Sequence, residues 1–241
     1  MDLSSQFSSH LAPFSPGFQR LLGLPYERAE QVRNVCPDLS HEVLVARRHA
    51  RVRPALDPVD GTANFVHGIP LVAVSLGLLQ AGKQVLGVVD LPILDERYAA
   101  VEAGGAVNRA GRIGVRQTRG LSEAIVSIGD YAVGPESAEK NRARYALTIG
   151  LAEQVQRVRM LGSAAIDLVW VAEGKLDACV MLANKPWDTA AGVAIAREAG
   201  ALVVDLDGSP HTASSYATIA MAPGIADAVL ALVQEATQAK Q

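Results

Sequence analysis

The chain has 241 residues, of which 49% are hydrophobic and 20% are charged, and its formal net charge at pH 7 is −3. This composition indicates a soluble globular protein with a sizeable core, and its slightly acidic balance disfavours nucleic acid or an anionic membrane as the main partner. Cys36 and Cys179 are too far apart in sequence to suggest a disulfide framework, and no apolar run approaches the ~20 residues of a membrane span, so we expect a cytoplasmic protein.

The N-terminal region, residues 1–53, shows little regular periodicity. Proline and glycine interrupt residues 1–25, which predicts irregular structure, whereas residues 26–35 predict a short charged helix and 42–46 a strand or a helix end. A basic cluster follows, comprising Arg47, Arg48, His49, Arg51 and Arg53. Its simplest interpretation is a solvated basic face, with phosphate steering or an RNA contact as alternatives.

The stretch D-P-V-D-G-T-A-N-F, residues 57–65, is the most informative part of the chain. Asp57 and Asp60 lie three residues apart, and Pro58 and Gly61 favour a sharp turn around them. Such a turn can direct both carboxylates and the carbonyl of Val59 to one point, which is an oxygen-only site suited to Mg²⁺.

The residues after this pair of acids offer a place for a phosphate. Gly61, Thr62 and Ala63 provide backbone N–H groups and a hydroxyl where a helix can begin. An alternative remains open, because Asp-Pro and Asp-Gly are among the commonest loop dipeptides and the stretch can be an Asp-rich turn without function.

The first half of the chain predicts an antiparallel sheet with helices packed on it. Residues 71–79 and 85–91 are β-rich and flank a Gly82-Lys83 turn, which predicts a hairpin. A third strand at 97–101 precedes the Gly104-Gly105 turn, and 124–128 predicts another short strand.

The second half predicts alternating strands and helices. We expect helices at 137–155, from Gly162-Ser163 to Glu173 with a stop at Gly174, from about Asp188 to Gly200, and at 225–237. The strands are expected at 155–161, 176–182, 201–204 and 216–221. Asp188 falls at the start of the third helix, where it is either an N-cap or a site residue.

Three segments together resemble the inositol monophosphatase family of metal-dependent sugar phosphatases: D-P-V-D-G-T-A-N-F-V-H-G-I-P, L-G-S-A-A-I-D-L and P-W-D-T-A-A-G-V-A-I-A-R-E-A-G-A. The resemblance covers roughly residues 54–235. It implies an α/β (α+β) fold, a layered αβαβα sandwich of the inositol monophosphatase and fructose-1,6-bisphosphatase type with a shortened, atypical N-terminus. It also implies a homodimer, Mg²⁺ as cofactor and Li⁺ as inhibitor.

The resemblance implies one phosphatase-like domain over residues 1–241, with an atypical region at 1–53, an antiparallel-sheet half at 54–130 and an α/β half at 131–241. It also assigns the metal ligands. Asp57 would bridge two Mg²⁺ ions, the Val59 carbonyl would bind the first, and Asp60 and Asp188 would bind the second. These cations would offset the repulsion of three gathered carboxylates.

The remaining roles that the resemblance implies concern water, phosphate and substrate. Thr62, with Asp57 the expected catalytic residue, would orient the water that attacks phosphorus, and the Gly61 and Thr62 amides would hold phosphate oxygens. Gly162, Ser163 and Ala164 would contact the alcohol part of the substrate, again at a helix N-terminus.

The chain also departs from the family pattern. Members carry an acidic pair before the first Asp motif, whereas here residues 42–46 lead into Arg47-Arg48; Glu42 or Asp38 are possible displaced substitutes. We therefore hypothesise weakened metal affinity, or a protein that binds phosphorylated ligands without hydrolysing them efficiently. An arginine cannot ligate Mg²⁺, yet it can take the place of the cation and hold a phosphate.

Substrate choice is a second departure. Met181 stands where the family often has an acidic residue that meets sugar hydroxyls, while Asn184 and Lys185 supply nearby polarity, and Lys185 can favour an additional negative charge on the substrate. Inositol phosphate, another sugar phosphate, histidinol phosphate, fructose 1,6-bisphosphate and a 3′-phosphonucleotide all stay open.

Two hypotheses of different classes result. The first is a Mg²⁺-dependent phosphomonoesterase acting on a small polyol or sugar phosphate, with Asp188 and Lys185 also near the substrate. The second is a non-catalytic binding or regulatory protein that uses the basic cluster, since some relatives contact the transcription machinery.

Overall fold

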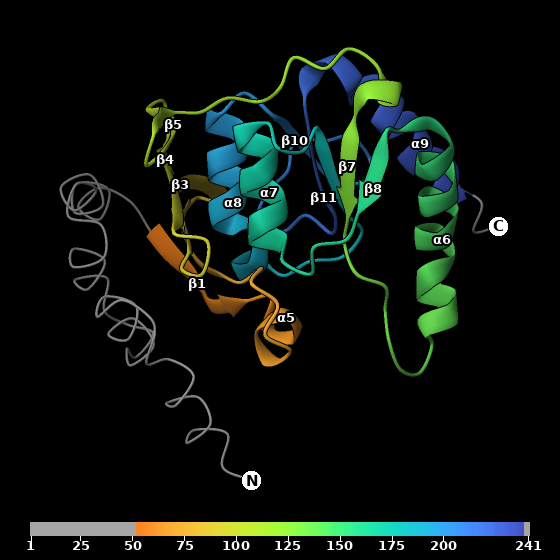
Figure 1. Cartoon of the computed structure of the whole chain (residues 1–241), viewed down its shortest axis with the longest axis horizontal. Helices are drawn as coiled ribbons and strands as arrows, with labels where there is room; N and C mark the ends of the chain where they lie inside the picture. Colours follow the sequence, from red (N-terminus) through yellow and green to blue (C-terminus); the bar gives the residue numbers. More distant parts are fainter. Residues whose placement is uncertain (1–51, 239–241) are drawn as a thin grey trace, which may run out of the picture.

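The structure is a computed structural model that describes residues 52–238. The helix and strand expected at 26–35 and 42–46, the acids Asp38 and Glu42, and all of the basic cluster except Arg53 lie outside the described residues. The described chain forms two β-sheets separated and flanked by helices (Figure 1).

The first sheet is an antiparallel meander of six strands in chain order. The predicted hairpin is confirmed, because two of these strands pair through Gln80 and Lys83 around the Ala81-Gly82 turn. The strands are β1 (Val52–Asp60), β2 (Ala73–Gln80), β3 (Lys83–Leu91), β4 (Glu96–Val101), β5 (Gly105–Asn108) and β6 (Gly111–Arg112).

Strand β1 was not predicted, and it changes the interpretation of the acidic motif. Asp57 pairs with Ser75 of β2, and the register shifts between Asp57 and Asp60. Pro58 is tolerated because β1 is an edge strand of this sheet, where a missing N–H breaks no ladder bond to a further strand. The two acids therefore lie at the irregular end of a strand rather than in a free turn.

The second sheet has five strands in the order β10, β11, β9, β7, β8, with β7 parallel to both β8 and β9. The four strands predicted for the second half, and the one at 124–128, are confirmed with shorter bounds. They are β7 (Ile125–Ile128), β8 (Arg157–Arg159), β9 (Ala178–Met181), β10 (Leu202–Val204) and β11 (Thr218–Met221).

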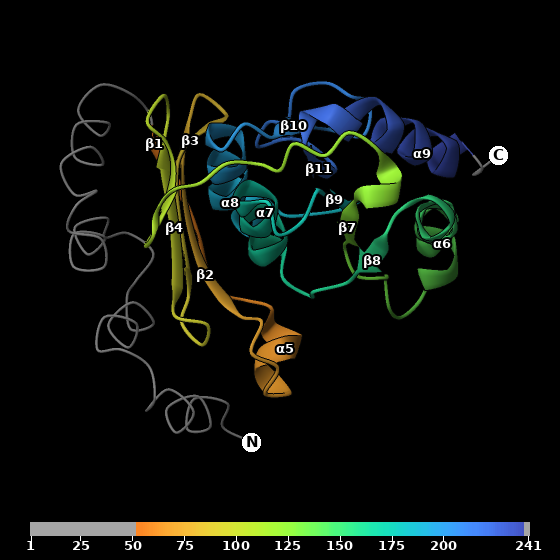
Figure 2. The same cartoon turned by 45° about the horizontal axis from the view of Figure 1, so that its top comes forward.

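The longer helices form two layers. Helices α7 (Ala164–Glu173) and α8 (Pro186–Glu198) lie between the two sheets, and α6 (Ser137–Gln154) and α9 (Ala226–Gln238) pack on the far side of the second sheet (Figure 2). A short helix, α5 (Thr62–Val66), follows β1, and two 3₁₀ helices, η3 (Leu121–Glu123) and η4 (Pro223–Ile225), complete the chain. The described residues thus provide a βαβα stack, and none of their helices is long and apolar enough to cross a membrane.

The ends of α7 follow the sequence rules. The Ser163 hydroxyl accepts a hydrogen bond from the Ile166 amide at the start, and Gly174 adopts the left-handed conformation at the end, with φ of 77°. In α6, by contrast, Leu147 and Leu151 are buried, but the apolar Tyr145 and Ile149 point away from the core and are largely exposed.

Glycines allow α8 to approach the first sheet closely. A Cβ at Gly77 would lie 2.6 Å from the Ala190 Cβ, and one at Gly87 would lie 2.8 Å from the Ala191 carbonyl carbon. On the other side of the same helix, a Cβ at Gly192 would meet the Leu168 Cβ of α7 at 2.6 Å. This tight packing fixes the helix that carries Asp188.

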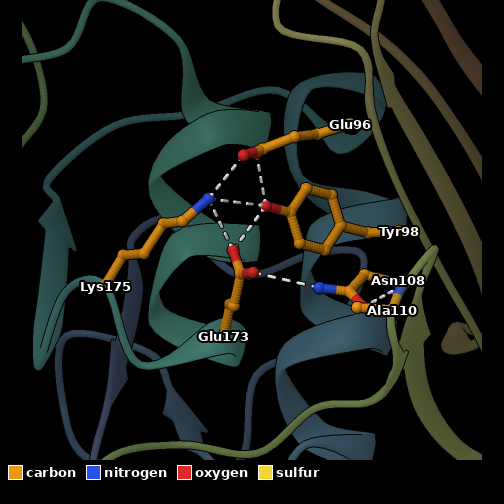
Figure 3. A network of polar contacts seen from close by, with 6 residues as sticks. All are labelled: Glu96, Tyr98, Asn108, Ala110, Glu173 and Lys175. Atoms are coloured by element: carbon orange, nitrogen blue, oxygen red, sulfur yellow. Dashed lines mark hydrogen bonds and ion pairs between the residues drawn. The ribbon is translucent and has the colours of Figure 1, made fainter.

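A polar network ties the first sheet to the C-terminal end of α7 (Figure 3). The buried Tyr98 hydroxyl lies 2.6 Å from an oxygen of both Glu96 and Glu173, and Lys175 bonds the same two carboxylates at 2.7 and 2.8 Å. Burial and the two carboxylates raise the pKa of Tyr98 well above its usual value, so its hydroxyl stays a donor. Asn108 extends the network by donating to Glu173 at 3.0 Å.

Candidate active site

The site begins at the end of β1, where the backbone folds around the first acid. The Val59 amide donates to Asp57 Oδ1 at 3.0 Å, and the Thr62 hydroxyl donates to the Val59 carbonyl oxygen at 3.0 Å. These two local bonds hold the half-buried Asp57 carboxylate, the Val59 carbonyl and the Thr62 hydroxyl in one small volume.

Gly61 is required at the next position by both conformation and space. Its φ is 81°, a value that L-residues rarely adopt, and a Cβ there would lie 2.7 Å from the Leu71 carbonyl oxygen and 3.4 Å from the Ser163 Cβ. The glycine therefore lets the acidic motif pack directly against the start of α7. Helix α5 begins immediately afterwards at Thr62.

Asp60 is buried against the N-terminus of α7. Its Oδ2 accepts hydrogen bonds from the Ser163 hydroxyl and from the Ala165 amide, the latter at 2.9 Å. The positive end of the helix dipole and these two donors favour the ionised carboxylate. Ser163 is thus both the N-cap of α7 and the hydrogen-bond donor to Asp60. The two residues are 103 positions apart in the sequence.

Asp188 is placed by the first turn of α8. The N-cap of this helix is Lys185, and the Lys185 amide donates to Asp188 Oδ2 at 3.0 Å. The carboxylate therefore reaches back from the third helical position to the N-cap, as in a capping box. The simple N-cap interpretation of Asp188 is wrong by three residues, although the side chain does help to close the helix.

The three carboxylates lie near enough to influence one another. Burial raises the pKa of Asp57, Asp60 and Asp188, that of Asp60 to about 6. The charges of Asp57 and Asp188 raise the pKa of Asp60 further, and the charge of Asp57 raises that of Asp188. The fold thus brings acids from β1 and α8 together, and the electrostatic cost of burying their charges is one that a bound cation would offset.

The donor set matches a hard cation. One oxygen of each acid is hydrogen-bonded, while no hydrogen bond within residues 52–238 engages Asp57 Oδ2, Asp60 Oδ1 or Asp188 Oδ1. In that same range, however, no three His, Cys, Asp or Glu side chains are already close enough to hold a metal ion. The described residues fit Mg²⁺ in chemistry and form an open, incomplete ligand set.

Comparison with known proteins shows the family of the chain. The model of the inositol monophosphatase family matches residues 36–238, which is most of the chain. The chain belongs to the inositol monophosphatase family. The resemblance inferred from the three sequence segments is therefore confirmed.

Individual members of the inositol monophosphatase family show the extent of the likeness. Inositol-1-monophosphatase ImpA of Mycolicibacterium smegmatis is 35% identical over 179 residues, 74% of this chain and 65% of that protein. The match thus spans slightly less than two thirds of that relative. The Nus factor SuhB of Pasteurella multocida is 32% identical over 211 residues, 85% of this chain and 77% of SuhB.

A solved structure supports the fold. The IMPase of Thermotoga maritima superimposes with a TM-score of 0.71 at 34% identity, covering 78% of this chain and 70% of that one. The predicted fold class, a layered sandwich of the inositol monophosphatase type, is therefore confirmed.

The other site residues expected from the family lie around the three acids. Gly162 and Ala164 flank Ser163 at the start of α7, and Lys185 is exposed at the start of α8, where its charge lowers the pKa of Asp188. Met181 is buried in the core between the sheets, so it offers nothing to a sugar hydroxyl. Contact of these residues with substrate stays a prediction.

Sequence reasoning missed Asn64, which joins two parts of the site. Its side-chain amide donates to the Leu71 carbonyl at 2.9 Å and to the Leu161 carbonyl at 2.7 Å. The residue is buried and directly faces Gly162, where a Cβ would lie 3.0 Å from Asn64 Nδ2. Asn64 therefore connects the loop before α7 to α5, the helix that follows the acidic motif. Its position in the motif did not indicate this role in the sequence.

A second missed residue is Asp167, one turn into α7. Its Oδ1 is buried without a hydrogen-bond partner among the described residues. Burial raises its pKa to about 8; the Ser127 hydroxyl lowers it, and the charges of Asp60 and Asp130 raise it. At neutral pH this side chain is therefore largely a neutral acid placed behind the carboxylates of the site.

Asp167→Asn is expected to change how stability depends on pH. A carboxyl whose pKa is raised on folding favours the folded state at low pH, and this contribution is lost as the pH rises from about 4 to about 8. The amide variant should therefore be more stable than the parent at pH 8, by several kcal/mol, and similar at pH 4. Urea unfolding across this range tests it, with the exposed Asp227→Asn as control; parallel curves for parent and Asp167→Asn would refute the assignment.

Ser163→Ala is expected to act on both stability and Asp60. Loss of the N-cap acceptor should lower the free energy of unfolding by about 1 kcal/mol. Because the Ser163 bond lowers the pKa of Asp60, its loss should also shift metal binding to higher pH. Ser163→Thr keeps the hydroxyl and should restore both properties; a pH profile of Mn²⁺ binding that is unaltered in Ser163→Ala would contradict this role.

Proposed function

We propose that the protein is a metal-dependent phosphomonoesterase that hydrolyses a small polyol or sugar phosphate, with Mg²⁺ as its cofactor. The observation that carries the proposal is the convergence of Asp57, Asp60 and Asp188 beside the start of α7. Burial raises the pKa of all three acids, and neighbouring carboxylates raise those of Asp60 and Asp188 further. This arrangement is costly for stability alone, and a divalent cation offsets that cost.

The carboxylates and the Val59 carbonyl would hold the metal. A bound divalent cation supplies charge neutralisation for the phosphate and acidifies the attacking water. The Val59 amide holds Asp57 Oδ1, so Asp57 Oδ2, which has no hydrogen bond to the described residues, would be the oxygen offered to the metal. Ser163 and the Ala165 amide keep Asp60 oriented from behind.

The residues after Asp60 would handle water and phosphate. The Thr62 hydroxyl donates a hydrogen bond to the Val59 carbonyl oxygen, so the lone pairs of the hydroxyl oxygen can accept a hydrogen bond from the attacking water and orient it. The amides of Gly61 and Thr62 precede the first intrahelical hydrogen bonds of α5 and are available to phosphate oxygens. Gly162 and Ala164, at the start of α7, would meet the alcohol group.

The acidic pair that the family carries before this motif has no counterpart in residues 52–60, and Arg47-Arg48 precede them. We infer that the first metal position has one charged ligand fewer and binds Mg²⁺ weakly. The test is phosphate release from myo-inositol 1-phosphate as a function of Mg²⁺ concentration. We expect half-saturation in the millimolar range or above, and inhibition by Li⁺; full turnover at sub-millimolar Mg²⁺ would contradict the weakened site.

The same assay addresses the substrate class. Histidinol phosphate, fructose 1,6-bisphosphate and a 3′-phosphonucleotide are alternatives that keep the chemistry and change the alcohol. The exposed Lys185 beside Asp188 favours substrates with a second negative charge. A higher kcat/KM for fructose 1,6-bisphosphate than for inositol 1-phosphate would select that alternative. We also expect the active form to be a homodimer.

A regulatory role is the second candidate, favoured by the likeness to a protein named as a Nus factor. In this case the chain would bind a macromolecular partner through the basic cluster and would not need turnover. Binding should then persist in Asp57→Asn and weaken steeply with salt. Turnover that requires Asp57, without such binding, would leave the phosphatase proposal alone.

A further inference from the structure

A buried polar chain leads from the end of α8 to the loop before its start. It runs through five residues from different parts of the fold: Arg197 in the last turn of α8, Gln84 of β3, His211 between β10 and β11, Thr218 of β11 and Asn184 between β9 and α8. Its three central residues, Gln84, His211 and Thr218, are each at most 4% exposed. The phosphatase proposal gives none of these five a part in catalysis.

The hydrogen bonds of this chain are continuous. Arg197 Nη1 donates to Gln84 Oε1 at 2.9 Å, and Gln84 Nε2 lies 3.3 Å from His211 Nδ1. His211 Nε2 lies 2.8 Å from Thr218 Oγ1, which also accepts from Asn184 Nδ2 at 2.6 Å. The Arg197 guanidinium bonds the His211 carbonyl oxygen as well, which closes the chain into a loop at that end.

The chemistry of the donors permits one assignment of protons. A guanidinium only donates, so the carbonyl oxygen of Gln84 must face Arg197 and its NH₂ group must face His211 Nδ1. Nδ1 therefore accepts, and the proton of a neutral imidazole sits on Nε2, from which it is donated to Thr218. Both acceptor directions of the Thr218 hydroxyl are then used, by His211 and by Asn184.

The electrostatic surroundings agree with a neutral imidazole. Burial, followed by the charge of Arg197, lowers the pKa of His211 to about 4, while the charge of Asp205 opposes this shift. Arg197 and Asp205 are the charged groups whose effect on the ring is resolved among residues 52–238. The chain is therefore a fixed set of neutral donors and acceptors at physiological pH, with one cation at its far end.

We propose that His211 and Thr218 are positioning residues, which fix the Asn184 side chain and through it the Lys185 amide that holds Asp188. Lys185 follows Asn184 directly, and its amide donates to Asp188 Oδ2 at 3.0 Å. Rotation of the Asn184 amide away from Thr218 would break the 2.6 Å bond and free the loop at the residue before this contact. Only the consequence for metal binding rests on the proposed function.

The test compares Thr218→Val with Thr218→Ser in the full chain without metal. Solvent-exchange NMR measures the exchange rate of the Lys185 amide proton. Thr218→Val removes the acceptor of Asn184 at nearly constant volume, so the rate should rise about tenfold, whereas Thr218→Ser keeps the hydroxyl and should stay within about twofold of the parent. Asn184→Ala removes the same hydrogen bond at its less buried partner and should also raise the Lys185 exchange rate. It replaces Thr218→Val in the test if that variant folds poorly.

A core variant separates positioning from general loss of stability. Val126→Ala on β7 removes buried methyl groups from the core shared with α6 and α9, and it should lower stability without changing Lys185 exchange. Equal exchange rates in Thr218→Val, Asn184→Ala and Val126→Ala would overturn the proposal. The Mn²⁺ dissociation constant, measured by calorimetry, should rise about fivefold in Thr218→Val and Asn184→Ala and stay near the parent value in Val126→Ala. If the parent binds no metal, a rise in Lys185 exchange confined to Thr218→Val and Asn184→Ala would support the positioning role and refute the metal-dependent function.

Discussion

Asp57→Asn is expected to reduce Mg²⁺-dependent phosphate release by about 10³-fold. The amide keeps the shape of the side chain and its bond from the Val59 amide, but it removes the negative charge that the metal needs. Because burial raises the pKa of Asp57, the ionised carboxylate disfavours the folded state without metal. The midpoint of urea unfolding at pH 7.5 should therefore move up, or stay unchanged, while activity is lost.

The control for this variant is Asp95→Asn. Asp95 is 81% exposed at the side chain and forms an ion pair with Arg109 at 2.8 Å. Its substitution should leave both turnover and unfolding near the parent values, since exposed ion pairs contribute little. Retention of a tenth or more of the parent turnover in Asp57→Asn would show that this carboxylate is not a metal ligand in the reaction.

Gly87→Ala is expected to lower the free energy of unfolding by about 3 kcal/mol. The new Cβ would overlap the backbone of Ala191, whose carbonyl carbon would be 2.8 Å away, and a helix backbone cannot move aside as a flexible side chain can. Because α8 carries Asp188 in its first turn, the shift of the helix should also weaken metal binding in the molecules that remain folded. Urea unfolding and Mn²⁺ calorimetry measure the two effects.

Gly120→Ala is the matched control for Gly87→Ala. It makes the same change at a residue with φ of −149°, where the nearest atom to a Cβ is Ser122 Oγ at 4.0 Å. Its effect should stay within about 0.5 kcal/mol. Comparable losses of unfolding free energy in Gly87→Ala and Gly120→Ala would mean that the close approach of α8 to β3 is not the cause of the destabilisation.

Much of the fold was predictable because its signals are local. The Gly82-Lys83 turn between two β-rich runs predicted the hairpin of β2 and β3, and Ser163 and Gly174 predicted both ends of α7. The motif residues also predicted that two distant segments share one site, since the family resemblance linked Asp57 and Asp188.

The parts that sequence reasoning missed depend on contacts distant in sequence. Strand β1 has an Asp-Pro step that is typical of loops, and only its edge position beside β2 makes it acceptable. Two hydrogen bonds, from Ser163 to Asp60 and from Asn64 to Leu161, join residues about a hundred positions apart. No local sequence pattern predicts them. Asp167 occupies an ordinary helical position, and its raised pKa results from burial in the assembled fold.

The most direct test of the account is a crystal structure of the full chain soaked with Mn²⁺ and phosphate, with the metal located by its anomalous scattering. The account predicts at least one peak bonded to carboxylate oxygens of both Asp57 and Asp188, with Asp60 in the same site. A fully active crystal form in which Mn²⁺ binds elsewhere, or in which these three carboxylates bind no metal, would contradict it.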